Sequence, residues 1–168
     1  MYAVSLFVLR EIFEIALIMS VVIAATRGLS GRLPYIGGGI LAGLMGAGVI
    51  AAFTGTISSL ADGMGQEIMN AAILLTAAAM IGWTAVWMRV HGRELSQKIK
   101  QTGSKINTGD SSMLILSFII ALAVFREGAE MVLFSYSAHI GGTSWIEIAE
   151  GVAIGTLGGI IIGTLFYL

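Results

Sequence analysis

Five long apolar stretches constrain the fold of this 168-residue chain more than any other feature of its sequence. They cover residues 3–26, 34–57, 67–90, 112–137 and 146–168. A helix needs about 20 apolar residues to cross a bilayer, whereas a strand of an outer-membrane barrel needs about 10 with strict alternation. The stretches in this chain have the length and composition of transmembrane helices. We therefore expect an all-α, polytopic transmembrane helix bundle of five spans that forms a single transmembrane domain over residues 1–168.

The composition excludes most other classes of protein. Hydrophobic residues make up 57% of the chain and charged residues 11%, with a mean hydropathy of +0.92. Soluble domains have about 45–50% apolar and about 25% charged residues. The absence of cysteine excludes a disulfide framework and a thiolate metal site. This composition excludes a nucleic-acid-binding protein, and since no H-E-x-x-H, P-loop or G-x-S-x-G motif occurs, we expect no enzyme.

The basic residues predict the orientation in the membrane. Arg27 and Arg32 lie between the first two expected spans, and the segment 91–111 after the third is rich in lysine. The other two connections contain neither lysine nor arginine. Because cytoplasmic loops carry the excess of positive charge, the N-terminus should lie outside a plasma membrane or bacterial inner membrane. The 91–111 segment is expected to be a short amphipathic or flexible cytoplasmic linker that sets the orientation or binds anionic lipid head groups.

The chain also contains an internal repeat. Arg10, Glu11 and Glu14 recur 116 positions later as Arg126, Glu127 and Glu130, and without a gap Gly39 falls on Gly155 and Gly43 on Gly159. Three spans separate the copies, so they should cross the membrane in opposite senses, as in many transporters. Repeat one covers 1–90 and a partial repeat two covers 112–168. A counterpart of 67–90 would lie near 183–206, beyond Leu168, so either the sequence is truncated or a second chain supplies this element.

Both copies of the repeated motif read R-E-x-x-E and lie inside apolar spans. Six charged groups facing lipid singly would cost roughly 15–20 kcal/mol, so they should face one another, water or an ion. Four carboxylates and two guanidiniums have a formal charge of -2, which suits a hard multivalent cation. The sequence therefore predicts glutamate metal ligands with supporting arginine ion pairs. Simple ion pairs that join two spans, and a proton relay, remain alternatives.

On these motifs the sequence resembles the iron permease family, which comprises the oxidase-dependent iron transporters of fungi and the bacterial iron uptake permeases. Arg126-Glu127-Gly128-Ala129-Glu130 is similar to the family's R-E-G-L-E motif, and residues 10–14 keep its charged positions. The end of the third span, Trp87-Met88-Arg89, is also similar. The resemblance implies a seven-span fold and high-affinity iron uptake. It also implies a ferroxidase or a periplasmic iron-delivery protein as partner.

The resemblance implies that four glutamates line the iron path: Glu11, Glu14, Glu127 and Glu130. Oxygen-only ligation favours Fe3+, with Fe2+ as the alternative. Acidic residues on the expected outer side would form a funnel that concentrates cations, and these are Asp62, Glu67, Glu147 and Glu150. Glycine faces suited to close helix packing make a homo-oligomer plausible. Two other functions remain open: a membrane assembly subunit that completes a transporter with another chain, and a proton-coupled cation carrier.

Overall fold

The computed structural model describes residues 2–60, 64–107 and 112–167, and this part of the chain forms five helices. They are α1 (Tyr2–Ala25), α2 (Arg32–Leu60), α3 (Met64–Asn107), α4 (Met113–Ile140) and α5 (Trp145–Tyr167). The expected all-α class is confirmed. Each expected span lies largely within one helix. Asp62 lies outside the described residues.

Two of the helices are long and apolar enough, by length and composition, to cross a membrane. They contain the segments Arg32–Thr54 and Trp145–Leu165, while α3 contains a shorter apolar segment, Asn70–Val86. The first and fourth helices each carry one charged triad within their apolar sequence. These features are typical of a helical membrane protein.

The third helix is longer than the sequence predicted. It continues without a break to Asn107, so the described residues up to 107 agree with the amphipathic alternative for 91–111 and not with the flexible one. The physical reason is an apolar stripe at helical spacing: Ile99, Gly103 and Ile106 are buried while the neighbouring lysines are exposed. A Cβ added at Gly103 would lie 2.7 Å from the Cβ of Ala25 in α1. The amphipathic character was therefore predicted correctly.

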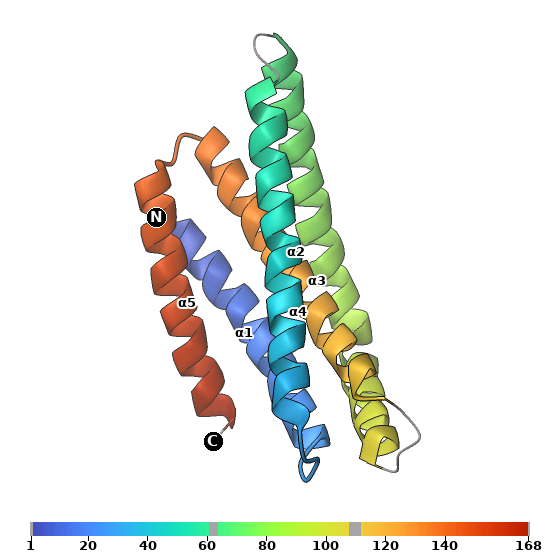
Figure 1. The fold of residues 1–168 in the computed structure, drawn as a ribbon. Helices are drawn as coiled ribbons and strands as arrows, with labels where there is room; N and C mark the ends of the chain where they lie inside the picture. Colours follow the sequence, from blue (N-terminus) through green and yellow to red (C-terminus); the bar gives the residue numbers. More distant parts are fainter. Residues whose placement is uncertain (1, 61–63, 108–111, 168) are drawn as a thin grey trace.

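The helices pack chiefly in two pairs, α1 against α5 and α2 against α4. In Figure 1, α1 and α4 run in opposite directions, and α5 lies beside α1 on one side of the bundle. Because α1 and α4 also contact each other, the two charged motifs lie within the bundle.

Glycines bring the backbones of each pair into close contact. A Cβ added at Gly43 would lie 2.7 Å from the Cβ of Val124, and one added at Gly155 would lie 2.8 Å from the Cβ of Val8. In both cases the backbone carbonyl oxygen three residues before the valine is also within 2.8 Å. Val8 and Val124 are 116 positions apart, whereas Gly43 and Gly155 are 112 apart. In the structure, the residue of α2 that is equivalent to Gly155 of α5 is therefore Gly43, and not Gly39 as in the gap-free alignment.

A second pair of contacts has the same register. Gly46 faces the ring of Phe125, and Gly158, 112 positions later, faces the side chain of Leu9. The gap-free glycine alignment is thus wrong by one helical turn in α2 and α5. The connection covers 141–144 after α4 and 26–31 after α1, so the shorter connection accounts for two of the four residues of this shift.

Candidate metal centre

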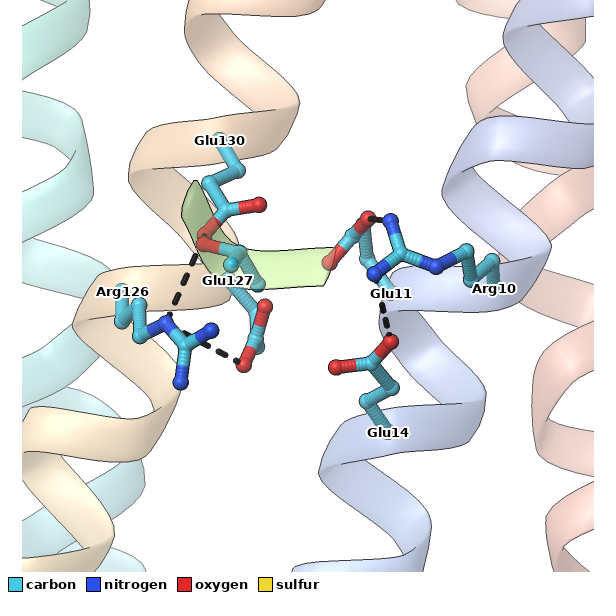
Figure 2. A network of polar contacts seen from close by, with 7 residues as sticks. Arg10, Glu11, Glu14, Arg126, Glu127 and Glu130 are labelled. Atoms are coloured by element: carbon cyan, nitrogen blue, oxygen red, sulfur yellow. Dashed lines mark hydrogen bonds and ion pairs between the residues drawn. The ribbon is translucent and has the colours of Figure 1, made fainter. Parts of the chain in front are cut away.

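The four motif glutamates lie on the facing sides of α1 and α4. Within each motif the two glutamates are three residues apart, so both side chains project from one face of the helix. Figure 2 shows the carboxyl groups of Glu11 and Glu14 pointing towards those of Glu127 and Glu130, across the space between the two helices. The structure therefore brings together the four residues that the sequence singled out.

Three of these carboxylates form a tight group. One oxygen each from Glu11, Glu14 and Glu127 lies within 4.8 Å of the others. The residues Glu11 and Glu127 are completely buried and Glu130 is 1% exposed, whereas the side chain of Glu14 is 14% exposed. Burial of several carboxylates at such distances is unfavourable unless positive charge or protons compensate them.

The two arginines flank the carboxylates on opposite sides and provide part of the compensating positive charge (Figure 2). Arg10 Nη1 lies 2.7 Å from Glu11 Oε1, and Arg10 Nη2 lies 2.7 Å from Glu14 Oε1. Arg126 Nε lies 3.4 Å from Glu130 Oε1 and 4.0 Å from Glu127 Oε1. Each arginine thus contacts both glutamates of its own motif, which fixes their rotamers and reduces the net negative charge.

A threonine of the third helix, Thr84, also contacts this group, and the sequence analysis did not identify it. Its hydroxyl donates a 2.6 Å hydrogen bond to Glu130 Oε1, and the residue is 3% exposed. A lone threonine in an apolar span gives no signal in the sequence, because threonine hydroxyls commonly bond to their own helix. Thr76 of the same helix does so, donating to the carbonyl of Ala72.

Several carboxylate oxygens of the group have no hydrogen-bond partner within the part of the chain that the structure describes. They belong to all four glutamates: Oε2 of Glu11, Oε2 of Glu14, both oxygens of Glu127 and Oε2 of Glu130. Buried polar atoms in folded proteins are nearly always paired. A cluster of unpaired, buried oxygens from four acidic residues is the donor set that a hard cation requires.

The residues between the charged positions explain how the motifs fit their neighbouring helices. A Cβ added at Gly128 in α4 would lie 2.7 Å from the Cβ of Ala47 in α2. The equivalent position in α1 is Ile12, and the Cβ of Ile12 lies opposite Gly159 of α5. In the α2–α4 pair the glycine, Gly128, is therefore on the helix that carries the motif. In the α1–α5 pair the glycine, Gly159, is on the other helix. This exchange explains why the first motif tolerates a large residue after Glu11.

The acidic residues of the expected funnel have a different environment. Glu67, Glu147 and Glu150 are exposed, and Glu147 forms a capping box with Ser144 at the start of α5. In this box Ser144 N donates to Glu147 Oε2 over 3.1 Å, and Glu147 N donates to Ser144 Oγ over 3.3 Å. The role of Glu147 in the fold is thus to stabilise a helix terminus, and a funnel stays a prediction.

Comparisons with known proteins agree with the resemblance noted in the sequence. The chain is 29% identical over 175 residues to the ferrous iron permease EfeU of Escherichia coli O6:H1 (strain CFT073), and 27% identical to that of Shigella sonnei (strain Ss046). Each alignment covers 99% of this chain but 61% of the relative, so the chain spans about three fifths of the length of these curated relatives. No solved structure matches it. The family model described as "Iron permease FTR1 family" matches residues 1–168, and the chain therefore belongs to this family of permeases, which are transporters and not enzymes.

Proposed function

We propose that this chain forms a membrane pathway for the high-affinity uptake of ferrous iron, with Glu11, Glu14, Glu127 and Glu130 as the iron-binding residues. One observation carries the proposal: three carboxylate oxygens from two helices lie within 4.8 Å of one another, buried and flanked by the arginines of the same motifs. Oxygen ligands lie about 2.0–2.2 Å from a small divalent cation, so opposite ligands are about 4.2 Å apart. Three ligands of one ion lie closer together than an opposite pair, and small rotamer changes would bring the three oxygens together from separations of up to 4.8 Å.

The charge of the site favours a divalent cation. Four glutamates and two arginines have a formal charge of -2, so bound Fe2+ would make the site neutral. Neutrality matters because uncompensated charge is costly in a low-dielectric environment. The similar proteins are named ferrous iron permeases, which points in the same direction. We therefore propose Fe2+ in place of Fe3+, which was expected from ligand chemistry alone.

We also propose that all five helices span the membrane as parts of an inverted repeat. The contacts of Gly43 with α4 and of Gly155 with α1 support the repeat, because they are equivalent under exchange of its two halves. The opposite directions of α1 and α4 support it too (Figure 1). The buried charges of these two helices face each other, so they do not prevent insertion in the membrane.

The proposed direction of transport follows from the distribution of charge. Basic residues gather at the ends of helices that we assign to the cytoplasm, among them Arg27, Lys98 and Lys100. The N-terminus then lies outside the plasma membrane or bacterial inner membrane. An inside-negative potential favours cation entry by about 2.3 kcal/mol per charge per 100 mV, and twice that for Fe2+. A ferroxidase or a periplasmic iron-delivery protein is the proposed partner.

The test is uptake of Fe2+ by proteoliposomes containing this chain. Wild type is compared with Glu14→Gln/Glu130→Gln, which keeps the size of both side chains, and with Glu94→Gln, which neutralises an exposed glutamate of α3 outside the site. We expect uptake with wild type and Glu94→Gln, and none with the double variant. Equal uptake by all three variants would refute the proposed site. Absence of uptake in every case, with Fe2+ bound only by proteins that keep the site, would favour an assembly subunit completed by another chain.

A further inference from the structure

We propose that Thr84 of α3 is a positioning residue of the iron site, which holds Glu130 so that a single oxygen of this carboxylate is available to the metal. The inference rests on the proposed function and adds a residue outside the R-E-x-x-E motifs.

Both partners of Glu130 bind the same carboxylate oxygen. The hydroxyl of Thr84 donates to Oε1 over 2.6 Å, and Arg126 Nε lies 3.4 Å from that atom. The other oxygen, Oε2, is buried and has no hydrogen-bond partner among the described residues. Figure 2 shows the Glu130 carboxyl group beside those of Glu127 and Glu11. With Oε1 held from two directions, Oε2 is left as a fixed, monodentate ligand.

The two motifs therefore differ in rigidity. Glu14, the residue equivalent to Glu130, is paired with Arg10, and its side chain is 14% exposed. Glu130 is 1% exposed and is bonded to residues from two helices. A ligand with both an arginine and a hydroxyl partner has less rotational freedom than a ligand with an arginine alone, so less entropy is lost when it binds the metal. Glu14 is one of the three residues whose oxygens lie within 4.8 Å of one another and Glu130 is not. Glu130 is therefore a fixed additional ligand beside that group.

Thr84 also brings a third helix to the site. α1 and α4 supply the four carboxylates, and the Thr84 hydroxyl links α3 to one of them. Hydrogen bonds to charged groups in proteins are stronger than those between neutral groups, particularly where water is absent. Loss of this hydroxyl should thus free the carboxylate of Glu130 and weaken metal binding.

The test is Fe2+ binding to the purified full chain in detergent, measured anaerobically by equilibrium dialysis. Thr84→Val removes the hydroxyl at nearly constant volume and Thr84→Ser retains it, while Thr76→Val is the matched control on the same helix. We expect Thr84→Val to weaken Fe2+ binding about 10- to 100-fold. Thr84→Ser and Thr76→Val should remain within about three-fold of wild type, since both retain the bond to Glu130.

An infrared measurement without metal separates positioning from a general loss of structure. The carboxylate band that disappears in Glu130→Gln should shift in Thr84→Val and keep its wild-type position in Thr84→Ser. An unshifted band, wild-type affinity of Thr84→Val, or equal losses in the valine and serine variants would overturn the inference. If Glu130→Gln weakens Fe2+ binding but Thr84→Val does not, the proposed function survives and this inference fails. If wild type binds no Fe2+, both fail.

Discussion

Gly155 of α5 lies directly against Val8 of α1, so close that an added Cβ would be 2.8 Å from the valine Cβ and 2.5 Å from the Ser5 carbonyl oxygen. We expect Gly155→Ala to destabilise the protein by about 1–3 kcal/mol, because the obstacle includes backbone and the helices must separate. The midpoint of thermal unfolding in detergent measures the effect. Gly48→Ala is the control, since nothing lies within 4 Å of its added Cβ. Equal midpoints for both variants would show that this contact does not determine the packing.

The two arginines should determine whether the site prefers a divalent or a trivalent cation. Arg10→Gln changes the formal charge of the site from -2 to -3. We expect the ratio of Ga3+ to Mn2+ affinity to rise about ten-fold or more, because one charge at about 4 Å is worth 1 kcal/mol in water and several times that in protein. Competition binding with these redox-inert ions measures the ratio. Arg10→Lys keeps the charge and should keep the ratio; a rise in both variants would mean that rotamer fixation, not charge, explains the effect.

The length of α3 leads to a prediction about hydrogen exchange. Because the helix continues to Asn107 and packs through Gly103 on Ala25, amides of residues 97–106 should be protected. Gly103→Val should increase exchange in this segment and in the last turn of α1. Gly82→Val, at a position of α3 with open space around it, should not. Rapid exchange throughout 91–107 in the wild type would restore the interpretation of this segment as a flexible linker.

The acidic funnel can be tested through its dependence on salt. We expect Glu67→Gln/Glu150→Gln to lower the initial rate of Fe2+ uptake about three-fold or more at 10 mM salt and to have no effect at 0.5 M, since salt screens exposed charges. Glu94→Gln neutralises an exposed glutamate towards the other end of α3 and serves as control. A rate change that persists at high salt would place these glutamates on the path itself.

The sequence predicted the helices and the four clustered glutamates because both depend on strong, local signals. Long apolar stretches specify helices, and a charged triad inside such a stretch must avoid lipid. The register of α2 and α5 could not be found in this way, because a shift of the glycine pattern by one turn leaves the composition of the helix unchanged. Thr84 gave no signal because its partner, Glu130, is distant in sequence and lies on another helix. The sequence left 91–111 open between an amphipathic and a flexible linker, because the lysines of this segment resemble those of a solvated loop.

The central claim is that Glu11, Glu14, Glu127 and Glu130 together bind one ferrous ion. It is tested most directly by the stoichiometry of anaerobic Fe2+ binding to the purified chain, with Glu11→Gln/Glu127→Gln and Glu150→Gln measured in parallel. The account predicts one tightly bound Fe2+ per chain in wild type and in Glu150→Gln, and loss of that ion in the double variant. A folded double variant that still binds one Fe2+ with wild-type affinity would contradict it.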